Sequence, residues 1–275
     1  MEIFGTYTGP DFLALYGILL TTCVIAGLWI PANLRPEGRR AGIEDMEEVA
    51  ILAGGFERHA MAVSSDLMAR DALTPGSKKR LRVSNAAVDT GLAGRAVLNE
   101  IGDLKLSHLK LATLFEGKKI EADLQRRGLL MDKGDQWKLR WLSVSPYLAL
   151  IALGLYRFFA GRAEGEATGF LLVMLIVTAV FAVVRFARLN KRTKAGNEVL
   201  RDLEQKASRL RRAPVANEAG FAVALFGTAV LVGTPWEQVH AMRNAGAGGG
   251  DGGVGGDDGG DGGGGCGGGC GGCGG

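Results

Sequence analysis

The chain has 275 residues, 47% of them hydrophobic, and its 32 basic and 29 acidic side chains leave a net charge of only +3. This length suits one or two domains. The small net charge hides a strong segregation, because apolar residues gather in a few long runs and charged residues lie between them. The pattern excludes a chain that is soluble throughout and is typical of an integral membrane protein.

The first apolar run, Phe12–Ile30, contains nineteen residues and no charge. A bilayer core of about 30 Å needs roughly 20 helical residues, so this run predicts a transmembrane helix. A cleavable signal peptide has a basic segment before its apolar core and a small-residue cleavage site after it. Residues 1–11 contain no Lys or Arg, and the run ends in Trp29, Ile30 and Pro31. We therefore expect a retained anchor after a short extracytoplasmic N-terminus.

Two more apolar runs follow close together and predict a helical hairpin. Residues 142–160 are interrupted only by Arg157, whose long side chain can reach the headgroups from near the end of the span. Residues 169–187 form the third run, and only the short link at 161–168 separates it from the second. Both helices are apolar on every face rather than along one stripe, which makes a hairpin buried in a soluble core the weaker alternative.

The distribution of Lys and Arg predicts the orientation in the membrane. Residues 1–11 carry none and the link at 161–168 carries one, whereas three arginines follow the first span and residues 188–212 hold nine basic side chains against three acids. All of these flanks predict the same orientation. We expect a protein of the bacterial inner (cytoplasmic) membrane with its N-terminus outside and residues 31–141, together with everything from residue 188 onward, inside.

Residues 31–141 form the stretch that we expect to fold as a cytoplasmic domain. Its signals include acidic residues in the first turn of a helix, where the helix dipole favours them, and the pair Gly54–Gly55, which separates two helices. The predicted helices cover residues 43–53, 56–69, 91–101 and 118–127, and a basic strand covers residues 78–83.

The last part of this stretch has the pattern of a helix followed by a tight hairpin. Gly128 lies where a left-handed residue ends a helix, and two short apolar strands, 129–131 and 137–139, flank a glycine-containing turn. The earlier segment Asp66–Leu73 matches Asp123–Leu130 at four of eight positions. The predicted fold class is mainly α: three transmembrane helices, a cytoplasmic helical domain of winged-helix type that is tandem in one interpretation, and a disordered tail.

The charges of this domain bear on its partners. A DNA-binding winged helix usually shows a basic face of one sign. The presumed recognition helix at 116–127 mixes four basic with three acidic side chains, which argues against nucleic acid. The basic run Lys78, Lys79, Arg80 and Arg82 is a candidate for contact with an anionic membrane surface, where each charge contributes on the order of 1 kcal/mol. A solvated loop is an equally good interpretation of this run.

Residues 188–245 predict a basic helical segment followed by a short apolar helix. The apolar part, Ala219–Val232, is rich in Ala and Gly and is bracketed by Pro214 and Pro235. At this length, a packed or interfacial helix and a fourth span at 219–233 are both open. The choice decides on which side of the membrane the C-terminal tail lies.

No constellation of catalytic residues emerges from the sequence. His59, His108 and His240 lie apart from any second ligand, and the motifs of a hydrolase nucleophile, a phosphate-binding loop and a zinc helix are absent. We interpret His59, on a predicted helix, as a surface or half-buried residue. Cys23 lies inside the first span, where a small apolar role is the default. The prediction is a protein without enzymatic activity and without a required cofactor.

Residues 246–275 contain 21 glycines, four aspartates and three cysteines, and no core can form from them. Cys266, Cys270 and Cys273 have the C-x3-C-x2-C spacing that some iron–sulfur enzymes use, but the barrel context of that motif is missing. Structural zinc sites use four ligands, so loose uptake of a metal by the three thiols is the remaining metal hypothesis. In the cytoplasm these thiols stay reduced, whereas outside it they favour intermolecular disulfides.

Several short elements are spread along the whole chain. They are an FLALY entry into the first span at Phe12–Tyr16, an EVAILAGG element at Glu48–Gly55, leucine-bounded turns at Leu67–Leu73 and Leu124–Leu130, and an ALFG element at Ala224–Gly227. With the Gly/Cys-rich C-terminus, these elements resemble those of a family of uncharacterised bacterial membrane proteins, which implies no known activity. The cytoplasmic unit also resembles Golgi-phosphoprotein-type helical domains, which bind phosphoinositides. The sequence reproduces no lipid-binding pocket, so this second resemblance points only toward membrane surfaces.

The leading functional hypothesis is a non-enzymatic, membrane-anchored scaffold or adaptor whose cytoplasmic domain binds a protein partner or the membrane surface. The lipid bilayer is its first expected partner, and the protein partner is unidentified. One alternative is a thiol-based metal or redox sensor that uses Cys266, Cys270 and Cys273. Another is a membrane-bound regulator that binds nucleic acid.

Overall fold

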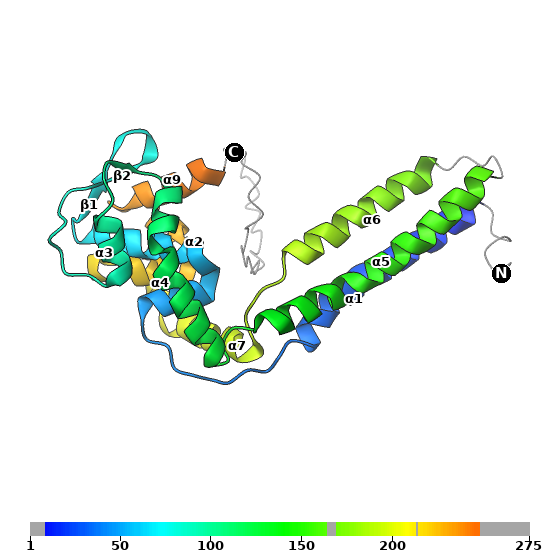
Figure 1. Ribbon diagram of the computed structural model, residues 1–275, viewed down its shortest axis with the longest axis horizontal. Helices are drawn as coiled ribbons and strands as arrows, with labels where there is room; N and C mark the ends of the chain where they lie inside the picture. Colours follow the sequence, from blue (N-terminus) through cyan, green and yellow to red (C-terminus); the bar gives the residue numbers. More distant parts are fainter. Residues whose placement is uncertain (1–8, 164–168, 213, 248–275) are drawn as a thin grey trace, which may run out of the picture.

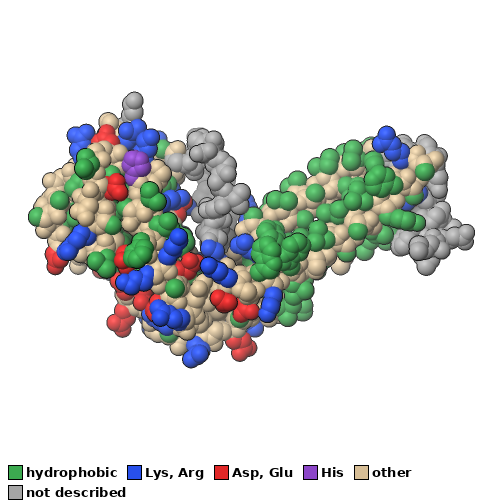
Figure 2. Space-filling model, viewed as in Figure 1, with side chains coloured by type: hydrophobic (Ala, Val, Ile, Leu, Met, Phe, Trp, Pro, Cys, Tyr) green, Lys and Arg blue, Asp and Glu red, His purple; other side chains and the backbone are tan. Residues whose placement is uncertain are grey.

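A computed structural model describes residues 9–163, 169–212 and 214–247. Figure 1 shows a long helical bundle joined at one end to a helical domain, and the described chain is mainly helical, as predicted. Hydrophobic side chains cover the bundle, while acidic and basic side chains gather on the domain and at the end of the bundle next to it (Figure 2). The bundle surface is therefore suited to lipid and the domain surface to water.

Three helices form the bundle: α1 at Gly9–Asn33, α5 at Lys133–Ala163 and α6 at Gly169–Ala187. Among the described residues, these are the three helices that are long and apolar enough to cross a membrane. This finding confirms the predicted set of candidate spans.

Small residues and a buried hydroxyl pair let the three helices approach one another. Gly27 of α1 faces the ring of Tyr147 of α5, and an added Cβ there would lie 2.8 Å from the phenolic oxygen. Gly154 of α5 leaves space for Tyr16 of α1, whose hydroxyl oxygen lies 3.1 Å from Thr178 Oγ1 of α6. In lipid there is no hydrophobic drive between helices, so such close contacts and hydrogen bonds hold them together.

Helix α5 begins at Lys133, well before the predicted start of the second span. The hairpin strand expected at 137–139 is therefore wrong, because these residues are helical. Asp132 precedes the helix, and its backbone carbonyl accepts the first helical N–H at 2.9 Å. Trp137 and Trp141 lie one turn apart and both pack on α6. The apolar pattern that suggested a strand is thus the start of a helix face.

The domain combines chain segments from before and after the α5–α6 hairpin, so it extends beyond the predicted unit at 31–141. Before the hairpin come helices α2 (Met46–Ala69), α3 (Leu92–Leu98) and α4 (Leu106–Arg126). After the hairpin come α7 (Lys194–Lys206), α8 (Ala219–Phe226) and α9 (Glu237–Ala247). Short 3-10 turns lie at Ser77–Lys79, Ser208–Arg211, Ala216–Glu218 and Thr228–Leu231.

A small antiparallel sheet with the order β1–β2–β3 completes the domain. Its strands are β1 at Leu73–Pro75, β2 at Leu81–Val83 and β3 at Asp103–Leu104. The β1–β2 hairpin follows α2 directly, so the first of the two expected helix–hairpin units is present. The second is not, because Leu130 pairs instead with Arg192, from the segment that follows α6.

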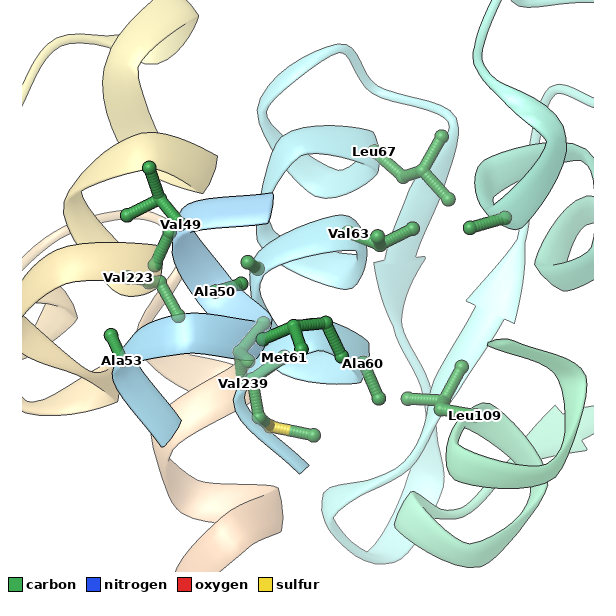
Figure 3. Close-up of a cluster of buried hydrophobic side chains, with 14 of the residues drawn as sticks. Val49, Ala50, Ala53, Ala60, Met61, Val63, Leu67, Leu109, Val223 and Val239 are labelled. Atoms are coloured by element: carbon green, nitrogen blue, oxygen red, sulfur yellow. The ribbon is translucent and has the colours of Figure 1, made fainter. Parts of the chain in front are cut away.

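Helix α2 lies at the centre of the domain core. Helix α4 and helix α8 both pack on it. Figure 3 shows Val49 of α2 beside Val223 of α8, with Leu109 of α4 on the opposite side of α2. All three side chains are fully buried. Burial of a side chain of this size contributes about 1.5–3 kcal/mol, so one core depends on segments from both sides of the α5–α6 hairpin.

The apolar stretch that the sequence left open as a fourth span lies inside this core. Helix α8 has eight residues, which corresponds to about 12 Å of helix against a bilayer core of about 30 Å. Gly220 lies so close to α2 that an added Cβ would be 2.8 Å from the Cβ of Asp66. Gly227, with φ of 79°, ends the helix. The helical part of this stretch therefore belongs to the domain.

Candidate functional site at the junction of bundle and domain

The chain passes between bundle and domain three times, and the three passes are hydrogen-bonded to one another. We call these segments the junction; they are residues 34–39, 128–132 and 188–195. Met131 N donates to Lys191 O at 2.8 Å and pairs the second pass with the third. Lys194 N donates to Pro36 O at 3.0 Å and ties the third pass to the first. The exit of α1, the entry to α5 and the exit of α6 therefore form one unit.

Two glycines permit the close approach of these segments. Gly38 and Gly128 have φ of 71° and 78°, in the left-handed region that favours glycine. An added Cβ on Gly38 would lie 2.2 Å from Gly128 O and 2.5 Å from Thr193 Oγ1. The prediction that Gly128 ends its helix is confirmed. Thr193 Oγ1 also accepts from Gly196 N at 3.1 Å and so caps the N-terminus of α7.

Arg192 connects the junction to the core helix. As predicted, Gly54 and Gly55 break α2, with φ of −160° and 65°. The break frees carbonyl groups at the end of the first half of the helix. Arg192 Nε donates to Leu52 O at 2.7 Å, and a terminal nitrogen of the same guanidinium donates to Ala53 O. A cation at the negative end of a helix is favourable, so a residue just beyond α6 caps the central helix of the domain.

Arg127, at the end of α4, bonds to α2 and to the segment that precedes it. One terminal nitrogen donates to Glu48 Oε1 at 2.8 Å and the other to Gly42 O at 2.7 Å, while Asp123 lies on its own helix at 3.3 Å. Burial by itself lowers the pKa of Arg127, but the carboxylates of Glu48 and Asp123 raise it above its usual value. A permanently charged side chain therefore links α4, α2 and the segment after α1.

The basic run noted in the sequence lies on the β1–β2 hairpin and the turn between its strands. Figure 2 shows basic side chains gathered over this end of the domain. Arg82 forms an ion pair with Asp103 at 3.0 Å, and its guanidinium holds the pKa of that carboxyl below its usual value. Lys79 is exposed, Arg80 is half-buried, and the side chain of Lys78 lies outside the described part of the structure. The run is thus brought together, but Arg82 is engaged within the domain.

His59 contradicts the expectation of a surface or half-buried residue, because its side chain is fully buried. Its Nε2 lies 2.9 Å from Glu47 Oε2. Its Nδ1 is buried without a hydrogen-bond partner among the described residues and faces Gly117 of α4. Glu47 and His59 lie on opposite sides of the break in α2, so helical periodicity could not predict that they meet.

An acidic cavity of about 360 Å³ lies beside α2, with Glu44, Asp45, Glu47 and Asp66 in its lining. Burial raises the pKa of Asp66, and Arg70 opposes this effect from 3.0 Å. Within the described ranges, no group of three or more His, Cys, Asp and Glu side chains could hold a metal ion. The tail thiols suggested as metal ligands lie outside those ranges; they are Cys266, Cys270 and Cys273.

Comparisons of the chain with protein-family models, with curated proteins and with solved structures find no match.

Proposed function

We propose that the protein is a non-enzymatic, membrane-anchored scaffold or adaptor that presents its domain on the cytoplasmic side of the bacterial inner membrane to a protein partner. The junction carries this proposal. A domain on a flexible tether needs only one covalent connection. Here three connections are hydrogen-bonded together, and Arg192 extends the bonding into α2. The arrangement holds the domain in one orientation on its anchor. A scaffold needs this to present a fixed binding surface to its partner. The winged-helix interpretation stays a prediction, restricted to the helix–hairpin unit at residues 56–83.

The outer face of α4 is the proposed partner-binding surface. Leu111 and Phe115, one turn apart, are 71% and 77% exposed, which is unusual for apolar side chains on a water-facing helix. Lys118 continues the same face, and no ion pair involving it is found among the described residues. In Figure 1 the bundle runs across the picture and α4 lies in front of α2, on which it packs. The outer face of α4 therefore points sideways from the bundle axis, which supports its use as a surface for a protein partner.

The test is photo-crosslinking in intact cells with a photoreactive amino acid at Leu111 or Phe115 of the full chain. We expect a discrete adduct of higher mass from both positions. Val215 is the matched control, because it is an apolar residue of the same domain that is 49% exposed and precedes the turn at Ala216–Glu218, which packs on α2 and α8. The adduct from position 111 should disappear in the Phe115→Ser variant. Equal labelling from position 215, or adducts with lipid alone, would contradict the proposal.

The proposed orientation has its own test. In a Cys23→Ser background, Cys266, Cys270 and Cys273 should react with a membrane-impermeant maleimide only after the cells are permeabilised. The tail then lies on the same side as the domain. Labelling of the three thiols in intact cells would reverse the orientation and would make disulfides between chains the expected state of the tail.

A further inference from the structure

The end of the bundle next to the domain carries an aromatic cluster made of Trp137, Trp141 and Phe186. The ring centroids of the two tryptophans lie 5.8 and 6.1 Å from that of Phe186, across the α5–α6 contact. Trp137 and Trp141 nevertheless remain 55% and 47% exposed. Tryptophan is enriched where a span meets the lipid headgroups. The cluster therefore places the headgroup level at the boundary between the apolar part of the bundle and the junction.

Two arginines from different helices lie at this level. The guanidinium carbon of Arg140, on α5, is 5.6 Å from the centroid of the Phe186 ring. Arg185, on α6, is the neighbour of Phe186 in the chain. The Nε of each arginine is buried and has no hydrogen-bond partner among the described residues. Buried donors are almost always paired with protein, water or a bound ion, so two unpaired ones on the helices that meet at Phe186 point to an acceptor from outside the chain.

The missing acceptor should be an anion from outside the chain. Neither the stretch of α5 at 137–147 nor the stretch of α6 at 182–187 contains an Asp or a Glu. No ion pair of Arg140 or Arg185 is found in the described part of the chain. A guanidinium offers several donors in a planar fork that matches a phosphate group. At headgroup level, the phosphate present at high local concentration is that of the lipid.

We propose that Arg140 and Arg185 bind the phosphate of an anionic phospholipid in the leaflet next to the domain, with Trp137 and Trp141 packed against the adjoining part of the lipid. One headgroup then bridges α5 and α6 directly beneath the junction. The lipid site is independent of the protein partner proposed above, because it is formed by the bundle and does not involve the domain surface.

Quenching of tryptophan fluorescence by lipids with brominated acyl chains tests the proposal on the full chain. Two of its four tryptophans are removed by Trp29→Phe and Trp236→Phe, so that the signal comes from Trp137 and Trp141. Brominated phosphatidylglycerol in a phosphatidylcholine host is compared with brominated phosphatidylcholine in a phosphatidylglycerol host. We expect an apparent preference for the anionic lipid of about tenfold, as charge-assisted bidentate contacts allow.

The Arg140→Gln/Arg185→Gln variant should bring this preference to within about twofold of unity. The Lys133→Gln/Lys138→Gln variant removes the same charge from the exposed start of α5 and should keep it. Arg140→Lys/Arg185→Lys retains the charge but not the fork, and should lose most of the preference if the contact is a bidentate one.

Three results would overturn the proposal. The first is an unchanged preference in the Arg140→Gln/Arg185→Gln variant. The second is an equal loss in the Lys133→Gln/Lys138→Gln control, which would indicate general surface charge rather than a site. The third is release of the brominated lipid by excess inorganic phosphate, which would identify a free phosphate as the ligand. Retention of the lipid in excess phosphate supports the lipid headgroup.

Discussion

The bundle and the domain are both helical, but they are held together in different ways. In the bundle, each helix contains a long apolar stretch, and the helices touch through a few close contacts such as that between Gly27 and Tyr147. In the domain, α2 is enclosed by α4 and α8, which come from different parts of the chain. A span is stable in lipid by its own composition and backbone hydrogen bonds. The domain helices depend on burial against one another.

The junction is where these two kinds of stability meet. If the bundle and the domain are separable, damage to the domain core should leave the bundle in the membrane, and damage to the junction should loosen one part from the other. The following variants test this difference, from the largest expected effect to the smallest.

Val223→Asp should unfold the domain. The side chain is fully buried between α8 and α2, and an unpaired charge there costs about 4 kcal/mol. Limited proteolysis should then degrade the domain, while the bundle fragments remain in the membrane after alkaline washing. Val232→Asp is the control, because Val232 is 56% exposed. Loss of the bundle from the membrane together with the domain would show that the two parts are not separable.

Gly38→Ala should open the junction. The new Cβ would lie 2.2 Å from Gly128 O in backbone with φ of 71°, at a cost of about 3 kcal/mol. Hydrogen exchange at the amides of Met131 and Lys194 should accelerate, because these N–H groups bond across the junction. At the control position Gly42, nothing lies within 4 Å of an added Cβ, so Gly42→Ala should leave exchange unchanged. Unchanged slow exchange in Gly38→Ala would mean that the backbone at Gly38 can accommodate a Cβ without loss of the hydrogen bonds across the junction.

Arg192→Ala should weaken the first half of α2. Removal of the guanidinium leaves the carbonyls of Leu52 and Ala53 without their donors, and hydrogen bonds from a charged group are worth about 2 kcal/mol. Exchange of the α2 amides before the break should accelerate. Arg201→Ala, an exposed arginine of α7, should have no such effect. Identical exchange in the two variants would show that Arg192, at the exit of α6, does not stabilise the first half of α2.

The smallest effect concerns Glu57, which lies 2.5 Å from Lys110 and 3.4 Å from Arg243. Burial alone raises the pKa of Glu57, but the two cations bring it below its usual value. Because the folded-state pKa is the lower one, the stabilisation is present above the unfolded-state pKa and is lost as pH falls through the folded-state value. Glu57 is about one-third exposed, so the contribution should be less than about 1 kcal/mol.

Chemical unfolding at neutral pH and near pH 4 measures this contribution. The free energy of unfolding of the native chain should fall more between the two conditions than that of Glu57→Gln. Glu198→Gln removes a carboxylate paired with Arg40 on the exposed surface and should resemble the native chain. A native-like pH response of Glu57→Gln would rule out a role for the Glu57 cluster in acid sensitivity.

Some features of the fold were predictable because they depend on neighbouring residues alone. The three candidate spans follow from the length and composition of their apolar runs, and the structure has helices long and apolar enough to cross a membrane at all three. Gly54 and Gly55 break α2, and Gly128 ends α4, where local glycine signals predicted them. Local chemistry was sufficient at these positions because a helix needs uninterrupted backbone bonding and glycine is the residue that most readily leaves it.

Other features needed partners that lie far away in the chain. The apolar residues at 137–139 have the pattern of a strand, but in the structure they are helical and Trp137 packs on α6. His59 looks like a surface residue until Glu47 is brought across the break in α2. In the sequence, Arg192 is one of nine basic side chains at 188–212 that predict the orientation in the membrane. In the structure, it caps the first half of α2. No periodicity in the sequence records these contacts, because each joins segments that are separated by other elements.

The sequence by itself determined that the protein has three candidate spans and a water-facing unit, because a long apolar run is stable in lipid whatever its neighbours are. Only the tertiary structure decided that residues from both sides of the α5–α6 hairpin share one core, that α8 lies within it, and that the three passes are bonded into a junction. The physical reason is that a short apolar helix such as Ala219–Phe226 has no stable position of its own and takes the one that α2 provides.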